Sequence, residues 1–548
     1  MAAQMSKNDP DFRIDVPEYF NFGYDIIDQR AEQDRNKLAM IWCNQFGAER
    51  KLTFLDISQL SNRAANILLK MGLKRDDAVA LMLPRIPEWW IFSIALIKLG
   101  IVQCSMPPLL TPLDIRHRME VGKFKLVITD IDNSGKFEEI YNDCPSFQHM
   151  LLAEGSKPGW ISYEEECAKM PRQSLYKVDT PEPVRTRADE CALVWFTSGT
   201  SKYPKLVAHS HSYPLGHQVT AVYWQRLTSN DLHLCWTDTG WAKIAWGGYF
   251  GQWLAGACLF VCDFRHKFIP EEIPPVLEKY GVTSLCAAPT IYRMLVLCDL
   301  KKYDLSQLKK CFTAGESIHK ETIDAWKEGT GQLIYEGYGQ TETVCMTCQT
   351  PEMPYRPGSM GQPTPGWHIE LHDEDGKPVP TGEEGRIAIR LGKETPAGLF
   401  LGYIGGDKEE VFGGGFYYSG DKARMDEEGF MWFAGRSDDI IKSSGYRISP
   451  SEVEYIIMQH SAVHEVAVVG APDPIRGIAI KAYIVLKPDY SPTEAMAREI
   501  QRHAKSLTAP YKYPRYVEFI SQMPKTYSGK IRRNVLRKHA EDGVCTWM

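Results

Sequence analysis

The segment from residue 197 to residue 205 has the residue types of a phosphate-binding loop. It follows the apolar run of residues 192–195, which is typical of a buried strand, and its glycine lets the backbone turn without a Cβ penalty. Backbone N–H groups and hydroxyls in such a turn can converge on an anion, and a lysine adds positive charge. The spacing differs from the GxxxxGK[ST] pattern of P-loop NTPases. The candidate phosphate ligands are Thr197, Ser198, Gly199, Thr200, Ser201 and Lys205.

Four further short motifs follow this loop along the chain. They are residues 338–342 (YGQTE), 418–421 (YSGD), 435–439 (GRSDD) and 524–530 (PKTYSGK). Each of them alone would be interpreted as an ordinary turn or an exposed loop. In this order, and together with the phosphate loop, they resemble the motif series of the adenylate-forming superfamily. That superfamily comprises acyl-CoA synthetases, carrier-protein adenylation domains and luciferases.

The resemblance covers the chain from about residue 19 to residue 533, and it is strongest to the medium-chain acyl-CoA synthetases. It is carried by residues 236–241 (WTDTGW), 337–343 (GYGQTET), 443–448 (SSGYRI) and 508–515 (TAPYKYPR). It implies an acid–thiol ligase with ATP and CoA as substrates. In such an enzyme a carboxylic acid and Mg·ATP form acyl-AMP and pyrophosphate, and CoA then displaces AMP.

The YGQTE motif is assigned to the nucleotide by this resemblance. Tyr338 would stack on adenine, Thr341 would meet the α-phosphate, and Glu342 would hold Mg²⁺. A carboxylate suits that role because Mg²⁺ takes hard oxygen ligands and keeps several waters. The resemblance extends the nucleotide site to Gly315, Glu316, Ser317, Glu336, Gly337, Gly339 and Gln340.

Asp421 and Arg436 are the candidate ribose ligands. A carboxylate can accept hydrogen bonds from both ribose hydroxyls, and a guanidinium can donate to the sugar or to a phosphate. A purely structural Asp–Arg salt bridge is the alternative interpretation. Asp438 stands where the family has its hinge, and its backbone would absorb the rotation of a small C-terminal domain.

Lys530 is the main catalytic candidate, with Thr341 and Glu342 completing the catalytic set. The attack of a carboxylate on an α-phosphate brings like charges together, so a cation that bridges both oxyanions should lower the barrier. The alternative is that Lys530 only makes an exposed turn more soluble. Its place in the PKTYSGK motif favours catalysis.

The CoA site is expected to draw on glycine-rich and basic positions near the end of the chain. Each arginine taken singly would be interpreted as a solvated surface residue, and only the match to the CoA-contacting positions of the family favours binding. The expected CoA ligands are Ser444, Gly445, Tyr446, Arg447, Arg476 and Arg515.

The acyl pocket is expected at Gly339 and Trp241. Acetate-specific relatives carry a tryptophan at the position of Gly339, so glycine predicts an open floor and an acid longer than acetate. Each buried methylene contributes about 0.8 kcal/mol, so preference for chain length should be graded. Short branched acids and C6–C10 straight acids both stay open.

Length and composition predict two domains and argue against several partners. A chain of 548 residues exceeds what one hydrophobic core usually organises. The net charge is −6, from 63 basic and 69 acidic residues without a long basic run, which argues against nucleic acid as a partner. We expect an adenylation domain over residues 1–436 and a mobile domain over residues 437–548. The residues leave both a monomer and an oligomer open.

The sequence also favours a cytoplasmic location without a membrane span. The 14 cysteines show no disulfide framework, and the first 15 residues lack the apolar core of a secretory signal. Three acidic residues among residues 7–15 argue against a mitochondrial presequence. The apolar run of residues 89–102 is shorter than the roughly 20 residues that a span needs, and it reads as a core helix followed by a strand.

Alternating helical and strand patterns predict an α/β fold. Helices are expected over residues 57–71 and 89–99, and strands over residues 78–83, 101–105, 126–129 and 150–152, which favours parallel sheets in layers with helices. After residue 435 the pattern changes to a compact α+β unit. Its elements are a helix that begins at Pro450 behind a Ser449 cap, a helix over residues 493–507, and strands over residues 466–469, 482–486 and 516–520.

Three other interpretations stay open at this point. An adenylating enzyme that loads a carrier protein would carry the same motifs, and so would a nucleotide-binding regulator that has lost catalysis. The pair Cys345 and Cys348 has the spacing of half a zinc site but has no second pair to complete it.

Overall fold

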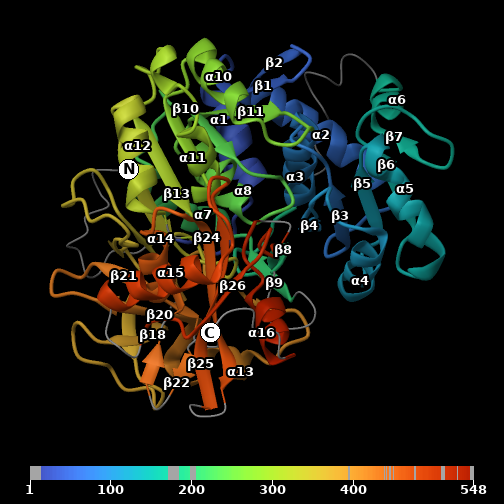
Figure 1. The fold of residues 1–548 in the computed structure, drawn as a ribbon. Coiled ribbons are helices and arrows are strands. Elements are labelled where there is room, and N and C mark those ends of the chain that lie inside the picture. The colour runs from blue at the N-terminus through green and yellow to red at the C-terminus, as the bar shows by residue number, and fades with distance from the viewer. Residues whose placement is uncertain are drawn as a thin grey trace. The chain divides into compact units, whose positions relative to one another are not determined.

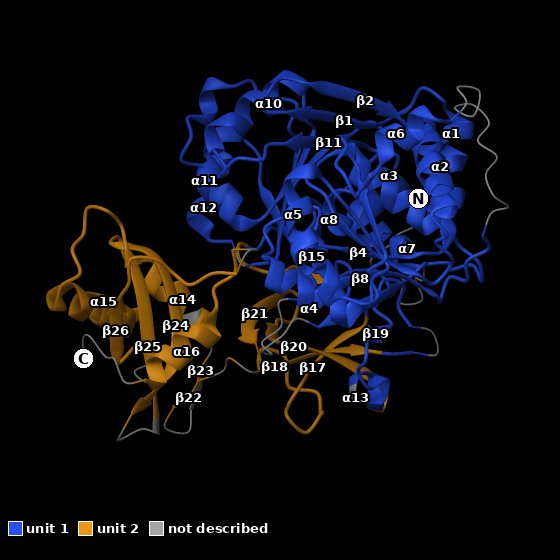
Figure 2. Ribbon diagram, turned by 90° about the vertical axis from the view of Figure 1, so that its right-hand side faces the viewer, with its two compact units in different colours: residues 1–356, 363–367, 391–413 blue, residues 357–362, 368–390, 414–548 orange. Residues whose placement is uncertain are grey.

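The computed structural model describes residues 14–170, 184–197, 205–316, 318–392, 395–436, 439, 441–443, 446–448, 450–473, 477–507, 512–526 and 529–542. The chain forms two compact units (Figure 2). Unit 1 comprises Met1–Arg356, Pro363–Trp367 and Leu391–Gly413, and unit 2 comprises Pro357–Gln362, His368–Arg390 and Gly414–Met548. The predicted domain boundary at residue 436 differs from the boundaries of these two units, and it stays a prediction.

One sheet of unit 1 is mostly parallel, with the strand order β15-β14-β13-β12-β10-β11-β1-β2. Neighbouring strands from β14 to β1 run parallel, and β15 and β2 pair antiparallel at the two ends. The strands are β1 Leu38–Asn44, β2 Glu49–Thr53, β10 Leu232–Trp236, β11 Cys258–Asp263, β12 Ser284–Ala287, β13 Lys310–Ala314, β14 Ile334–Tyr338 and β15 Thr347–Cys348; β16 Gln362–Pro363 follows β15 in the sheet.

A second sheet of unit 1 has the order β19-β9-β8-β4-β3-β5-β6-β7. Its strands from β8 to β7 are parallel, and β9 and β19 add an antiparallel edge. The strands are β3 Ala78–Met82, β4 Val102–Ser105, β5 Leu126–Thr129, β6 His149–Leu152, β7 Ile161–Ser162, β8 Cys191–Phe196, β9 Leu206–Ser210 and β19 Gly402–Tyr403.

Helices cover these sheets, as Figure 1 shows. Leu277, Tyr292 and Trp326 from α10, α11 and α12 are buried against apolar side chains of β10 to β14. The α-helices are α1 Gln29–Gln33, α2 Phe54–Lys70, α3 Pro87–Leu99, α4 Pro112–Gly122, α5 Ile131–Ile140, α6 Tyr163–Ala168, α7 Tyr213–Gln218, α8 Lys243–Gly247, α9 Phe250–Leu254, α10 Ile273–Tyr280, α11 Pro289–Leu295, α12 Lys320–Thr330 and α13 Lys408–Phe412. Two π-helices, Gly23–Asp28 and Val219–Trp224, precede α1 and follow α7, and short 3-10 turns cover Tyr141–Asp143, Pro270–Glu272, Leu300–Lys302 and Gly413–Gly415.

The described residues of unit 2 form three antiparallel or mixed sheets. The strands β17 Ile369–His372, β18 Glu384–Arg390, β20 Phe416–Met425 and β21 Met431–Arg436 form the first, and β22 Ile441–Ser443 and β23 Tyr446–Ile448 form a hairpin. The third comprises β24 Val463–Asp473, β25 Gly477–Leu486 and β26 Tyr516–Phe519, with helices α14 Pro450–Met458, α15 Glu494–Leu507 and α16 Arg533–Glu541.

The α/β prediction and most element positions are confirmed. The first predicted helix starts three residues earlier, at Phe54, because Thr53 and Asp56 form a reciprocal capping box. The predicted strands at 466–469 and 482–486 are the middles of a longer hairpin, β24 and β25, since the pairing continues past the apolar core positions. Helix α14 begins at Pro450 as expected, while its predicted cap, Ser449, lies outside the described residues.

In the described part of the chain, no helix is both long enough and apolar enough to cross a lipid bilayer. The apolar run that ends at Leu99 is the buried helix α3, and it is followed by strand β4, as expected.

Candidate active site

The YGQTE motif begins with the last residue of strand β14, which is the outermost strand of the parallel run in its sheet. Glu336, Gly337 and Tyr338 end the strand, so the polar residues behind them leave its carboxyl end, where ligands of α/β sheets usually bind. The backbone of the motif is anchored from several sides. Met346 N–H donates to Tyr338 O at 2.8 Å, and Gln340 N–H donates to Thr343 Oγ1 at 3.0 Å.

Thr341 and Glu342 are held by residues that the sequence did not single out for this purpose. Nε2 of His209 lies 2.7 Å from Thr341 O, and Phe400 N–H donates to Glu342 O at 2.9 Å. The Tyr403 hydroxyl donates to Glu342 Oε1 at 2.8 Å. These contacts come from β9 and from the segment leading into β19, so the second sheet fixes a motif that the first sheet carries.

Gly315 and Glu316 lie beside this motif. They follow β13, which pairs in parallel with β14 so that Ala314 stands opposite Gly337. Gly315 has φ +106°, a conformation that favours glycine. The Glu316 carboxylate accepts a hydrogen bond from Thr290 Oγ1 at 2.8 Å. The structure therefore brings two predicted nucleotide segments together, while Ser317 lies outside the described residues.

The predicted phosphate loop is described only at its two ends. Thr197 follows β8, and its N–H donates to Lys205 O at 3.0 Å, so the two described ends of the loop lie side by side where the antiparallel strands β8 and β9 pair. The Lys205 ammonium lies 4.6 Å from the centroid of the Tyr403 ring. Residues 198–201, which include four of the predicted ligands, lie outside the described residues.

The space beside Gly339 is filled. A Cβ atom at Gly339 would lie 2.3 Å from Cη2 of Trp246 and 2.4 Å from Val344 O. The expectation of an open floor therefore needs correction, because glycine here makes room for the Trp246 indole. Trp241 is half-buried in the loop before α8, and its role in the pocket stays a prediction, whereas Trp246 is buried in α8. From the sequence, Trp246 is expected at the end of an aromatic wall of the acyl pocket, with an ordinary core tryptophan as the alternative.

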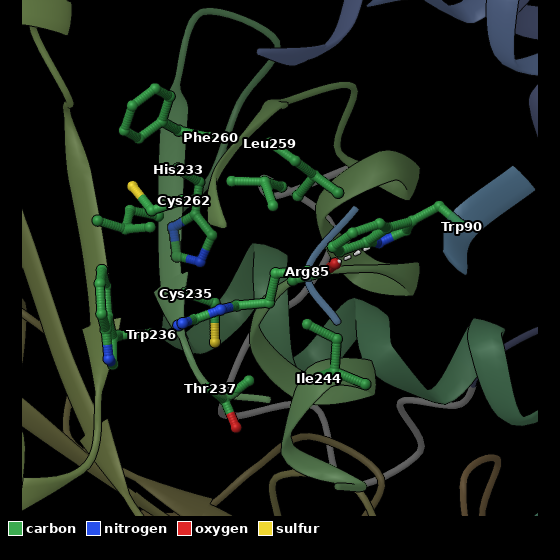
Figure 3. A pocket seen from close by; sticks show the side chains of 13 residues that line it. Arg85, Trp90, His233, Cys235, Trp236, Thr237, Ile244, Leu259, Phe260 and Cys262 are labelled. Carbon is green, nitrogen blue, oxygen red and sulfur yellow. Dashed lines mark hydrogen bonds between the residues drawn. The ribbon is translucent and has the colours of Figure 1, made fainter. Parts of the chain in front are cut away.

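A small cavity adjoins the WTDTGW segment within unit 1 (Figure 3). Arg85 reaches it with its guanidinium 4.7 Å from the Trp236 ring centroid, and Trp90 Nε1 donates to Gly248 O at 2.9 Å. His233 is satisfied on both ring nitrogens, by Ser284 Oγ at 2.8 Å and Gly247 O at 2.7 Å. The Arg85 contact lies at the end of β10, from which Thr237 and the predicted acid-binding segment continue, and the His233 contacts fix the strand near its start.

Asp421 and Arg436 of unit 2 face each other across β20 and β21. Arg436 Nη1 lies 3.6 Å from Asp421 Oδ1, the Asp421 side chain is 7 % exposed, and that of Arg436 is 41 % exposed. The structural salt bridge is thus present. Binding of the ribose by this pair stays a prediction, as does the hinge at Asp438, which lies outside the described residues.

Lys530 stands in a tight turn of unit 2. Thr526 N–H donates to Lys530 O at 2.7 Å, Lys530 N–H donates to Thr526 Oγ1 at 3.1 Å, and Gly529 has φ +85°. The side chain of Lys530 is exposed, while its neighbour Lys525 is tied to Glu465 at 2.8 Å. The turn therefore presents Lys530 to solvent on a backbone that is closed by hydrogen bonds.

Of the predicted CoA ligands, Arg515 is described in full. Its backbone N–H donates to Ile480 O at 2.9 Å, and its guanidinium lies 4.2 Å from the Tyr513 ring centroid. The backbones of Tyr446 and Arg447 form part of β23. Ser444, Gly445 and Arg476 lie outside the described residues, so the CoA site stays a prediction.

No group of three or more Cys, His, Asp or Glu side chains within the described ranges is arranged to hold a metal ion. Cys345 and Cys348 are free and buried, and Cys345 Sγ lies 3.3 Å from Thr347 O.

Buried histidines of unit 1 make the free energy of unfolding depend on pH. Burial lowers the pKa of His209 to about 3 and the pKa of His211 and His233 to about 4. In the unfolded chain these groups titrate near 6.5, so below that pH the unfolded state binds protons that the native state does not. Each such histidine should therefore destabilise the native state progressively as pH falls from about 6.5 towards 4.

We expect the free energy of unfolding, measured with urea, to fall between pH 7.5 and pH 5.5. Below pH 6.5 each buried histidine should contribute a slope of up to about 1.4 kcal/mol per pH unit. The variant His211→Gln should take up about one proton fewer on unfolding at pH 5.5. An unchanged slope in this variant would show that His211 is protonated in the native state.

The fold and the placement of the motifs define an adenylate-forming enzyme, and comparison with known proteins agrees. The model of the AMP-binding enzyme family matches residues 27–404, and the model of the AMP-binding enzyme C-terminal domain matches residues 452–530. Acyl-coenzyme A synthetase ACSM3, mitochondrial, of Mus musculus is 42% identical over 540 residues, which are 96% of this chain and 92% of the relative. Acyl-coenzyme A synthetase ACSM5, mitochondrial, of Homo sapiens is 41% identical, covering 95% of this chain and 91% of the relative.

A solved structure shows the same fold. The anthranilate CoA ligase AuaEII in complex with anthranoyl-AMP superposes with a TM-score of 0.86 at 30% sequence identity, covering 96% of this chain and 98% of the ligase. The chain therefore belongs to the family of AMP-binding enzymes. Within this family it is an ATP-dependent, AMP-forming acyl-CoA synthetase, so of the three functions that the motifs left open, the comparisons support this one.

The expectation of a cytoplasmic location is wrong. The names of these synthetases place them in mitochondria. The acidic residues near the start of the chain argued against a mitochondrial presequence, but they do not show where related proteins are located in the cell. They were therefore a poor guide to location.

Proposed function

We propose that the protein activates a short- or medium-chain carboxylic acid in two steps at one nucleotide site. The acid and Mg·ATP form acyl-AMP and pyrophosphate, and the CoA thiolate then displaces AMP. The observation that carries this proposal is the anchoring of Thr341 and Glu342 at the end of β14, beside Gly315 and Glu316 at the end of β13. Such fixed polar groups at the ends of neighbouring parallel strands suit a bound nucleotide.

The nucleotide roles follow the motifs. Tyr338 and residues 315–317 would bind adenine, the loop of residues 197–205 would bind the β- and γ-phosphates, and Thr341 would bind the α-phosphate. Asp421 and Arg436 would bind the ribose. The pairing of β13 with β14 supports the adenine and α-phosphate roles, because the two segments that would bind these groups follow neighbouring strands.

Glu342 would hold Mg²⁺. Its carboxylate is a hard oxygen donor that the Tyr403 hydroxyl and the backbone contact of Phe400 fix in place, which fits a cation that uses few protein carboxylates. When bound, Mg²⁺ would neutralise charge that develops on the phosphate oxygens.

Lys530 would serve the first step and the CoA-binding residues the second. In the first step its ammonium would bridge the acid carboxylate and the α-phosphate, where negative charge builds up. The domain of residues 437–548 would then turn about Asp438, so that Ser444, Gly445, Tyr446, Arg447, Arg476 and Arg515 could meet CoA. Lys530 is exposed on a turn that hydrogen bonds close, which supports a role in which its side chain must reach the bound acid and ATP.

Trp246 would limit the length of the acid, since its indole fills the space at Gly339. We expect Trp246→Ala to shift the preference from short towards longer acids, because each newly buried methylene adds about 0.8 kcal/mol, or roughly fourfold in affinity. The measurement is kcat/KM for AMP formation with a panel of straight C2 to C12 acids and branched short acids.

Trp326→Ala is the matched control, because Trp326 is also buried but lies in the core around α12. It should lower stability without changing the ratio of kcat/KM between C10 and C4 acids. If Trp246→Ala leaves that ratio unchanged as well, Trp246 does not bound the acid.

The relatives support a mitochondrial site of action for this enzyme.

A further inference from the structure

One tyrosine of unit 1 contacts two charged residues that are predicted to serve the triphosphate, Glu342 and Lys205. The Tyr403 hydroxyl donates to Glu342 Oε1 at 2.8 Å, and the face of its ring lies 4.6 Å from the Lys205 ammonium. Glu342 is the proposed metal ligand, and Lys205 is the predicted cation of the phosphate loop. A single side chain thus lies between the residue for Mg²⁺ and a residue for the phosphates.

The backbone around Tyr403 is fixed against the strand that leaves the phosphate loop. In β19, Tyr403 stands opposite Val207 of β9. Leu401 N–H donates to Ala208 O at 2.7 Å, and Ile404 N–H donates to Leu206 O at 2.9 Å. Tyr403 is therefore set by the same strand that begins one residue after Lys205.

Aromatic contacts and a second backbone bond fix the other side. The Phe400 ring packs edge-on against the Tyr403 ring, with centroids 5.0 Å apart at 67°. Phe400 N–H also donates to Glu342 O. The segment from Phe400 to Tyr403 consequently holds both the backbone and the carboxylate of Glu342.

These contacts have distinct chemical consequences. An ionised carboxylate accepts hydrogen bonds at several lone-pair positions, and a hydroxyl on Oε1 fixes the rotation of the group and so the direction of the remaining lone pairs. Partners of this kind behind a metal ligand typically change metal affinity 10- to 100-fold. A ring face under an ammonium restrains a flexible lysine through the cation–π interaction.

We propose that Tyr403 is a positioning residue that orders the triphosphate site through two separable contacts. Its hydroxyl aims the Glu342 carboxylate at Mg²⁺, and its ring holds Lys205 at the phosphates. The inference rests on the proposed function, in which Glu342 binds the metal and Lys205 binds the phosphates.

The test is equilibrium binding of ATP by isothermal titration calorimetry, with excess Mg²⁺ and separately with EDTA. Tyr403→Phe removes only the hydroxyl, so it should weaken Mg·ATP binding about tenfold and leave metal-free ATP binding unchanged. Tyr403→Leu also removes the ring, so it should weaken both forms by a further few-fold.

Tyr280→Phe is the matched control. The Tyr280 hydroxyl donates to Glu49 Oε2 at the same distance, 2.8 Å, on α10 of the same unit. This variant should bind both forms of ATP like the parent protein, and thermal unfolding should show that all variants are folded.

Glu342→Gln separates failure of this inference from failure of the proposed function. If Glu342→Gln loses the affinity gained from Mg²⁺ while Tyr403→Phe keeps it, the role of Tyr403 is overturned and the role of Glu342 stands. If Glu342→Gln keeps that gain, Glu342 is not the metal ligand and both ideas fall. Equal weakening of ATP binding with and without Mg²⁺ in Tyr403→Phe would also overturn the inference, because it would indicate general distortion.

Discussion

Replacing Lys530 with alanine should slow acyl-adenylate formation by about 10²-fold or more, because the cation that offsets charge in the transition state is lost. Thioester formation from a supplied acyl-AMP should stay nearly intact, since CoA attack on the adenylate does not need that cation at the carboxylate. The two half-reactions are measured separately, the first as pyrophosphate release without CoA and the second as AMP release from synthetic acyl-AMP and CoA.

Lys538→Ala provides the control for the loss of one exposed positive charge, since Lys538 lies on α16 of the same unit. It should leave both half-reactions unchanged. Equal loss of both half-reactions in Lys530→Ala would contradict the assigned role and point instead to damage of the whole C-terminal unit.

The largest effect on stability is expected at a buried ion pair far from the nucleotide. The Lys98 side chain in α3 is 1 % exposed, and its ammonium donates to Asp28 Oδ1 at 2.7 Å and to Asn62 Oδ1 at 2.6 Å. Removing the carboxylate leaves a buried charge without its counterion. Asp28→Ala should therefore lower the free energy of unfolding by about 3–5 kcal/mol, as measured by urea denaturation.

Two further variants make this expectation specific. The double variant Asp28→Leu with Lys98→Met replaces the pair by apolar groups and should recover most of the loss, because no charge stays buried. Glu328→Ala breaks an exposed ion pair with Lys301 and should change stability little. A small effect of Asp28→Ala would mean that Asn62 alone, or water, satisfies the Lys98 ammonium.

The same lysine shows what the sequence could predict about the fold. The apolar run around Lys98 predicted a buried helix, and its position, together with the strands on either side, is confirmed because local periodicity determines such elements. The counterion could not be predicted. Asp28 lies 70 residues away in a π-helix, and nothing in the local pattern of either segment indicates the other.

The candidate site divides in a similar way. The YGQTE motif and the strand before it could be predicted, because both are recognised from the local pattern of residues in a single sequence. The residues that hold the motif, His209, Phe400 and Tyr403, come from other strands and loops, so only the tertiary pairing of β9 with β19 reveals them. The open pocket floor predicted at Gly339 also failed for want of tertiary information. The Trp246 indole reaches that space from α8, which lies far away in the sequence.

Isotope labelling shows whether the acid attacks the α-phosphate of ATP. The enzyme is incubated with Mg·ATP, CoA and a medium-chain acid labelled with ¹⁸O in both carboxyl oxygens, and the products are analysed by mass spectrometry. If the acid attacks the α-phosphate, AMP should carry one ¹⁸O atom and pyrophosphate should carry none. Formation of ADP, with ¹⁸O in inorganic phosphate, would contradict it.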